Sequence, residues 1–210
     1  MRLVLASASP RRAELLRAAG YTFDTRAVDL DERVQPGESP QTYVARLARE
    51  KSSAAMQLLG RRVPHDALVV LGADTTVVVD GEILGKPVDD RDGEHMLRKL
   101  SGRQHEVLTG VSLRTSSAER GRVVTTSVYM TALSAEDIAW YVASGEGRDK
   151  AGAYAIQGVA SRWIPRIEGD YFNVVGLPVA LVCRMLQENG VGSHKVDLHK
   201  NDWQKNEDKL

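Results

Sequence analysis

The chain has 210 residues, 42% of them apolar, and its 28 basic side chains balance its 28 acidic ones. This is the composition of an ordinary soluble globular protein, and the even charge balance excludes a broad electrostatic grip on nucleic acid or on an anionic membrane. Any anion-binding site must therefore be local.

The few signals of cellular compartment agree with one another. The single cysteine, Cys183, lies in the apolar run VALVCRML, which favours a reduced, buried structural thiol and a cytoplasmic protein. The apolar stretch in RLVLASAS is much shorter than the roughly 7–15 residues of a signal peptide, and no later run approaches the length of a membrane span. We expect a cytoplasmic protein that binds neither membranes nor nucleic acid.

The N-terminal part predicts a strand and two helices. RLVLAS is a short apolar strand, and Ser9 as N-cap with Pro10 at the first helical position predicts a helix over 9–19. An extended segment around TFDTRAVDL follows. A second helix opens in the same way at Ser39-Pro40 and runs through YVARLAREKSSAAMQLL.

The middle of the chain predicts strands. DALVVLGAD is an apolar run that ends on an acid, so we expect a buried strand that delivers Asp74 at its tip. TTVVVDGEILGKP predicts a hairpin turning at Asp80-Gly81. A helix around GEHMLRKL and two strands near HEVLTGVSLR and RVVTTSVYMT follow.

The C-terminal part predicts a helix with a capping box at Ser134 and Asp137, a hairpin over SRWIPRIEGDYFNVV and a closing helix from Pro178. The polar stretch 191–210 has no helical or strand period, so we expect a loosely ordered tail. Together these elements predict an α/β fold with a mixed sheet and two lobes, in a single domain over 1–190.

Several common catalytic motifs are absent from the sequence. It contains no GxxxxGK[ST] phosphate loop, no GxGxxG fingerprint and no GxSxG elbow, and its five histidines lack metal-ligand spacing. These absences disfavour a P-loop kinase, a Rossmann dehydrogenase and a serine hydrolase.

Two arginines occupy the first turn of the first predicted helix, where the helix dipole is already positive. Arg11 and Arg12, together with the free backbone N–H groups of that turn, would make a strong phosphate clamp. The alternative is that both side chains extend into solvent and tolerate a small dipole penalty.

Asp74 lies in apolar surroundings, where a carboxylate either pairs with a cation or metal or has a raised pKa. The alternative is a strand-end aspartate that caps a turn. Lys86 in GKP is one hairpin away and could lean back toward Asp74, or it is simply a solvated lysine at a strand end.

The acidic cluster DLDE, with Asp29, Asp31 and Glu32, falls in a predicted loop. If Glu32 faces Asp74 across a cleft, the carboxylates would suit Mg²⁺ or Mn²⁺, which take oxygen ligands and bridge substrate phosphates. A solvated acidic loop explains the cluster equally well. Lys51 and Lys150 are further candidate phosphate ligands.

Read together, these segments resemble the Maf family of nucleoside triphosphate pyrophosphatases. The matching pieces are LASASPRRAELL, PGESPQTYVARLAREK with the acidic loop before it, GADTTVVVDGEILGKP, LSGRQHEVLTGV, YVASGEGRDKAGAYAIQG and GDYFNVVGLP. Their order and spacing cover the chain to about residue 188. The tail is not covered.

The resemblance implies an elongated mixed sheet with flanking helices and two lobes around a central cleft, as in the inosine triphosphate pyrophosphatases. It implies hydrolysis of a nucleoside triphosphate to the monophosphate and pyrophosphate with Mg²⁺ or Mn²⁺, and a homodimer. Asp74 matches the catalytic proton acceptor and, with Glu32, holds the metal. The residues expected to bind substrate are Ser7, Arg11, Arg12, Lys51, Thr75, Lys86, Lys150 and Gln157.

In the dTTP/UTP branch of the family, residues matching Arg11, Thr75 and Gln157 accompany pyrimidine preference, and Thr75 and Gln157 favour that branch here. The branch resembling 7-methyl-GTP pyrophosphatases has glutamine after the catalytic aspartate and glutamate at the later position. A glutamine amide presents both a donor and an acceptor to a pyrimidine edge, whereas ionised glutamate only accepts. One departure is Val159-Ala160-Ser161, where relatives often have a glycine-rich stretch; it leaves the shape of that loop open.

The expected function is therefore hydrolysis of dTTP and UTP, or of modified pyrimidine nucleotides, which would keep non-cognate nucleotides from being incorporated. Two alternatives stay open. One is a nucleotide-binding regulator of septum formation, to which Maf relatives have been linked, and the other is a pyrophosphatase acting on 7-methyl-GTP.

Overall fold

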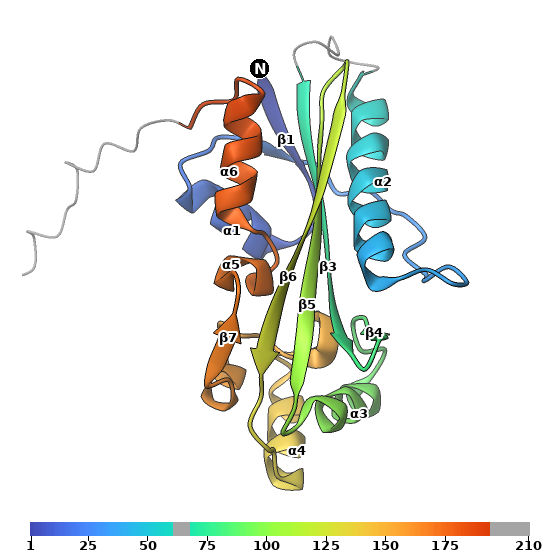
Figure 1. Ribbon diagram of the computed structural model, residues 1–210, viewed down its shortest axis with the longest axis vertical. Coiled ribbons are helices and arrows are strands. Elements are labelled where there is room, and N and C mark those ends of the chain that lie inside the picture. Colours follow the sequence, from blue (N-terminus) through green and yellow to red (C-terminus); the bar gives the residue numbers. More distant parts are fainter. Residues whose placement is uncertain (61–67, 194–210) are drawn as a thin grey trace, which may run out of the picture.

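The computed structural model describes residues 1–60 and 68–193, and in this part of the chain seven strands form one mixed sheet (Figure 1). The strands are β1 (Arg2–Ala6), β2 (Asp24–Thr25), β3 (Leu68–Val79), β4 (Glu82–Leu84), β5 (Gln104–Arg114), β6 (Glu119–Tyr129) and β7 (Arg166–Glu168). They lie in the order β2-β1-β3-β5-β6-β7, and β4 pairs with β3. The predicted mixed sheet is confirmed.

Strand β3 has an edge that is only partly paired. It runs antiparallel to β5 over residues 70–78 on one side. On the other side, β1 pairs in parallel with residues 68–72, and β4 pairs with residues 77–79. In the described sheet, positions 73–76 therefore have no partner strand on that side. Asp74 lies in this gap.

Helices cover both faces of the sheet (Figure 1). The α-helices are α1 (Pro10–Ala18), α2 (Pro40–Gly60), α3 (Asp90–Leu100), α4 (Ala135–Ser144), α5 (Tyr171–Val175) and α6 (Val179–Glu188). The long helix α2 packs on one face, and α1 and α6 lie on the opposite one. Because side chains alternate along β3, Gly72 and Asp74 face α2 while Ala73 and Thr75 face the other way.

Two glycines let the backbone of α2 rest directly on the sheet. A Cβ atom at Gly72 would lie 2.2 Å from the carbonyl oxygen of Ala48, and one at Gly110 would lie 2.2 Å from that of Val44. Any side chain there would push α2 away, so Gly72 fixes the distance of α2 from β3 and Gly110 fixes its distance from β5.

The two largest hydrophobic clusters lie toward opposite ends of β3. One joins Leu71 and Ala73 of β3 to α1 and α6, and the other joins Val77 and Val79 to α3 and α4. Thr75 lies between them along the strand. Cys183 is partly buried rather than fully buried.

Most predicted elements with local start or stop signals are confirmed. Ser9 caps α1 and Pro10 is its first residue, Ser134 and Asp137 form the capping box of α4, and α6 begins after Pro178. The β3–β4 hairpin turns at Asp80-Gly81, where both residues have positive φ angles, 50° and 78°.

Two expectations are wrong. Asp74 does not stand at a strand tip, because pairing with β5 continues past it to residue 78. Residues 161–175 do not form a hairpin: a 3₁₀ helix (Val159–Trp163) leads to β7, which pairs with β6, and the chain then enters α5. Asp170 accepts a hydrogen bond from the Phe172 N–H and starts that helix. The predicted extended segment around 22–30 contains only the two-residue β2.

The predicted tail lies outside the described residues from position 194 onward. None of the described helices is long and apolar enough to cross a membrane.

Candidate active site

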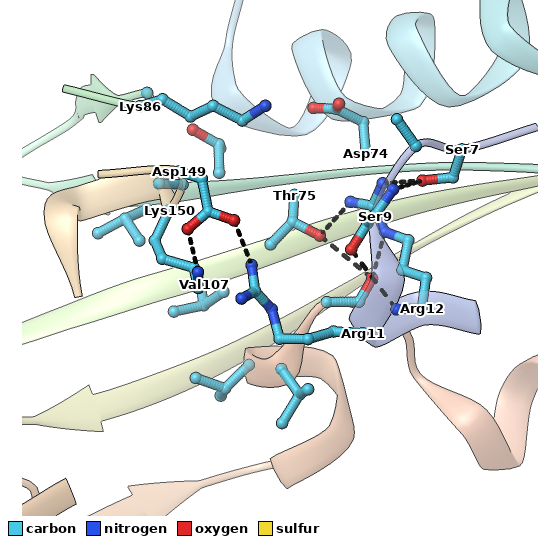
Figure 2. Close-up of a pocket in the computed structure, with 18 of the residues that line it drawn as sticks. Ser7, Ser9, Arg11, Arg12, Asp74, Thr75, Lys86, Val107, Asp149 and Lys150 are labelled. Carbon is cyan, nitrogen blue, oxygen red and sulfur yellow. Dashed lines mark hydrogen bonds and ion pairs between the residues drawn. The ribbon is translucent and has the colours of Figure 1, made fainter. Parts of the chain in front are cut away.

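A cavity of about 300 Å³ opens beside the unpaired edge of β3 (Figure 2). Its walls come from the end of β1, the start of α1, the loop before α2, α2 itself, the hairpin that follows β3, residues 149–157 and the end of α5. Because β3 has no partner strand on this side, side chains from both of its faces reach the same space. Asp74 and Thr75 therefore line one cavity from opposite faces of the strand.

Every residue predicted to bind substrate or metal lines this cavity. They are Ser7, Arg11, Arg12, Glu32, Lys51, Asp74, Thr75, Lys86, Lys150 and Gln157. These side chains come from seven separate stretches of the chain, and the fold brings them together.

A lysine lies between the two predicted metal-binding carboxylates. Lys51 Nζ of α2 is 2.6 Å from Asp74 Oδ1 and 2.6 Å from Glu32 Oε1. The side chains of Asp74 and Lys51 are only 10% and 11% exposed, whereas that of Glu32 is 47% exposed. The two carboxylates therefore converge on one cationic point.

Burial and neighbouring charges shift the pKa values of the two carboxyl groups in opposite directions. Burial raises the pKa of Asp74 above its ordinary value, although the positive charges of Lys51 and Arg12 oppose the change. Burial also disfavours ionisation of Glu32, but the hydrogen bond and charge of Lys51, with Lys86 and Arg12, outweigh it and lower the pKa of Glu32. Glu32 is thus the more readily ionised of the pair.

Arg12 is buried and bonded internally, so it does not extend into solvent. Its Nε donates to the carbonyl oxygen of Gly176 at 2.8 Å, and Nη1 donates to Ser7 Oγ at 3.0 Å and to the carbonyl oxygen of Ala73 at 2.9 Å. Nη2 donates to Thr75 Oγ1 at 2.9 Å. These four contacts use most of the five guanidinium N–H donors. Arg12 therefore ties the start of α1 to the open edge of β3.

The other cations of the cavity, Arg11, Lys86 and Lys150, are more exposed than Arg12 and Lys51. Figure 2 shows Arg11 and Lys150 both directed at Asp149: Arg11 Nη2 lies 3.7 Å from Asp149 Oδ2, and Lys150 is paired with the same carboxylate. Lys86 extends from just beyond β4 toward the side on which Asp74 lies. Arg11, Lys86 and Lys150 surround a space where a polyanion would be attracted.

The Thr75 hydroxyl, which lines the cavity, has three hydrogen-bond partners. It accepts from Arg12, is hydrogen-bonded to Thr109 Oγ1 at 2.9 Å, and lies 3.4 Å from the carbonyl oxygen of Gly176. Gln157 lines the same cavity from the loop that follows α4.

Among the lining residues that were not predicted from the sequence, three have ionisable side chains: Tyr43, Asp149 and Tyr154. Tyr43 falls on the apolar face of a helix and Tyr154 in a run of small residues, so neither carries a local signal. Asp149 precedes the candidate Lys150 in DKAG, and this charged pair is the one sequence signal that indicates a position in the cavity.

The chemistry of the carboxylate pair fits a hard divalent cation. In the described residues no group of three or more His, Cys, Asp or Glu side chains could hold a metal. Mg²⁺ does not need one, because it is commonly bound through one or two carboxylates, with waters and substrate phosphates completing its shell. Asp74 and Glu32, already converging on one cation, are the two residues that could hold such an ion.

Comparison with known proteins places the chain in a family. The model of the family described as Maf-like protein matches residues 2–189. The chain belongs to the Maf family. Among relatives of this Maf chain, the dTTP/UTP pyrophosphatase of Koribacter versatilis is 50% identical over 191 residues, covering 91% of this chain and 96% of that protein. Those of Anaeromyxobacter dehalogenans and Hahella chejuensis are 50% and 49% identical, with 90% of this chain covered in each case and 94% and 93% of those proteins.

Among solved structures, that of the Staphylococcus aureus Ham1 protein is partly similar to this Maf chain. The two share 18% sequence identity at a TM-score of 0.44, over 62% of this chain and 72% of the other.

Proposed function

We propose that this Maf chain hydrolyses dTTP and UTP to the nucleoside monophosphate and pyrophosphate. Relatives half identical to it over nine-tenths of its length bear that name. The observation that carries the proposal is the convergence of Asp74, Glu32 and Lys51 with Arg11 and Lys86 in one cavity beside an open strand edge.

In the proposed reaction Asp74 is the proton acceptor. Lys51 holds Asp74 Oδ1, which leaves Oδ2 to orient a water and take its proton. The water oxygen bonds to the α-phosphorus as the bond from that phosphorus to the bridging oxygen breaks, and pyrophosphate leaves. Arg11, Lys86 and Lys150 offset the negative charge that builds on the leaving group.

The proposed cofactor is Mg²⁺ or Mn²⁺, held by Asp74 and Glu32. Such an ion, when bound, neutralises phosphate charge and orients the triphosphate.

Selectivity for the pyrimidine is assigned to Thr75 and Gln157. The Gln157 amide has a donor and an acceptor, and a uracil or thymine edge alternates acceptor and donor. Arg12 acts through Thr75, because its Nη2 fixes the orientation of the Thr75 hydroxyl.

A substrate panel tests the proposal. Pyrophosphate release is measured from dTTP, UTP, ATP, GTP and 7-methyl-GTP with Mg²⁺ and with Mn²⁺. We expect release from dTTP and UTP well above the other nucleotides. Tight binding of dTTP without release would favour the regulator of septum formation instead, and preferred release from 7-methyl-GTP would overturn the pyrimidine assignment.

Three further expectations stay predictions: a cytoplasmic location, a homodimer, and a single domain over 1–190. The size of the purified protein in solution checks the second.

A further inference from the structure

The loop that carries Glu32 has few ties to the rest of the molecule. Residues 26–39, between β2 and α2, contain no helix or strand. In the described structure, two backbone carbonyl oxygens between positions 27 and 37 accept hydrogen bonds from side chains outside the loop. That of Glu32 accepts from the Tyr43 hydroxyl at 2.9 Å, and that of Arg33 accepts from Arg46 Nη2 at 3.1 Å.

Both donors come from one side of α2. Tyr43 and Arg46 are three residues apart, so they lie one turn apart on the same helix face. Lys51, which contacts Glu32 and Asp74, is on the same helix. The helix that supplies the bridging lysine therefore also holds the loop that supplies one of the bridged carboxylates.

Arg46 is itself fixed by a buried ion pair. Its Nε lies 2.7 Å from Glu38 Oε1 and its Nη2 lies 2.8 Å from Glu38 Oε2, a two-point contact. The side chains of Arg46 and Glu38 are only 9% and 4% exposed. Glu38 Oε2 also accepts from the Gln35 N–H at 3.0 Å. Through Arg46, the end of the loop at Glu38 and its middle at Arg33 are joined to one point on α2.

The protonation states of Tyr43 and Glu38 favour the hydrogen bonds that hold the loop. Burial, together with the negative charges of Asp74 and Glu32, raises the pKa of Tyr43 to about 12, so its hydroxyl stays a donor. The hydrogen bond from Arg46 lowers the pKa of Glu38, which keeps that carboxylate ionised.

We propose that Tyr43, Arg46 and Glu38 are positioning residues for the metal site: they hold the loop so that Glu32 faces Asp74 before any cation binds. The inference rests on the proposed function, in which Glu32 is a metal ligand. Without these anchors, the ion pair with Lys51 would be left to hold the half-exposed carboxylate of an irregular loop beside the like charge of Asp74. Groups that orient metal ligands typically change metal affinity by 10- to 100-fold when they are removed.

The test measures Mn²⁺ binding to the nucleotide-free protein by titration calorimetry and amide hydrogen exchange of residues 26–39. Tyr43→Phe removes one hydroxyl only. The double variant Glu38→Leu with Arg46→Met replaces the buried ion pair by apolar side chains, so neither charge is left alone in the interior. We expect each to bind Mn²⁺ about 10-fold or more weakly and to exchange the loop amides faster than the parent protein.

Two control variants separate this inference from its premise. Glu94→Gln breaks the exposed ion pair between Arg98 and Glu94 on α3 and should leave Mn²⁺ affinity and loop exchange unchanged. Glu32→Gln should lose Mn²⁺ affinity while the loop amides exchange as in the parent, because its backbone anchors are intact.

Parental Mn²⁺ affinity in Tyr43→Phe overturns the positioning role, and this variant decides alone if the double variant does not fold. If Glu32→Gln binds Mn²⁺ as the parent does, the metal assignment of the proposed function fails, and the positioning role falls with it.

Discussion

His105 is the buried residue whose protonation most directly links pH to stability. Its Nε2 is hydrogen-bonded to the Tyr154 hydroxyl at 2.8 Å, and its Nδ1 is buried without a partner among the described residues. Burial lowers the pKa of His105 to about 4, from an ordinary value of 6.5. The imidazole is therefore neutral in the folded protein at neutral pH.

The unfolded chain binds this proton first, because its histidine has the higher pKa. The contribution of neutral His105 to the free energy of unfolding is therefore complete above about pH 6.5. It is lost as the pH drops toward 4, which lowers the free energy of unfolding by up to about 3 kcal/mol. Urea unfolding at several pH values measures the slope. The same experiment on His105→Gln should give a shallower fall over this range; an identical slope would show that His105 does not titrate in this way.

The Gln157 amide is expected to contribute to selectivity for a pyrimidine base. Replacing the amide by a carboxylate removes a donor from the cavity, so we expect Gln157→Glu to lower kcat/KM for dTTP and UTP by about 10- to 100-fold, the cost of one unmatched polar contact. Steady-state rates of pyrophosphate release measure it. Gln187→Glu on α6, outside the cavity lining, is the matched control and should be neutral; equal rates in both variants would remove Gln157 from base recognition.

At the scale of elements, the packing of α2 on the sheet sets the geometry of the site. This helix carries Lys51, and its distance from Asp74 is fixed by the two contacts at Gly72 and Gly110. The loop anchors Tyr43 and Arg46 lie on the same helix. A small shift of α2 would therefore move the lysine and Glu32 together, away from Asp74.

Gly110→Ala tests this packing. The new Cβ would meet the Val44 carbonyl, which is backbone and cannot swing aside, so we expect a loss of about 1–3 kcal/mol or more in unfolding free energy and a lower kcat. Chemical denaturation and rate measurements check both. Gly121→Ala on β6 is the control, since the nearest atom there is the side-chain Glu119 Oε1 at 3.4 Å. Equal stability of the two variants would mean that α2 has room to move.

At the scale of the whole molecule, the cavity exists because β3 is longer than either of its neighbours on one side. Pairing with β1 ends at residue 72 and pairing with β4 begins at residue 77. Hydrophobic clusters toward the two ends of the strand stabilise the flanking elements, and the cavity lies between these clusters. The arrangement presents side chains from both faces of one strand to a single cavity.

Features set by neighbouring residues could be predicted from the sequence, whereas features set by distant residues could not. Local signals such as Ser9-Pro10 and Asp80-Gly81 predicted helix starts and a turn correctly, because they act within a few residues. The position of Asp74 within its strand was missed, because its pairing with β5 depends on residues far along the chain.

The residue pattern indicated seven candidate site residues, namely Arg11, Arg12, Glu32, Lys51, Asp74, Lys86 and Lys150. The family resemblance supported them and added Thr75 and Gln157, whereas the contacts of all these residues required the structure. The bonds of Arg12 to Ala73 and Gly176 join positions 61 and 164 residues apart, and nothing local predicts them. The anchoring of the Glu32 loop by Arg46 was missed for the same reason.

Pyrophosphate release from dTTP by Asp74→Asn tests the role of Asp74 as proton acceptor most directly. Binding of dTTP and thermal unfolding are measured on the same preparation. We expect release to fall by about 10²-fold or more, the contribution of a lost general base, while the protein stays folded and still binds nucleotide. Release at the parental rate from the folded variant would contradict that role.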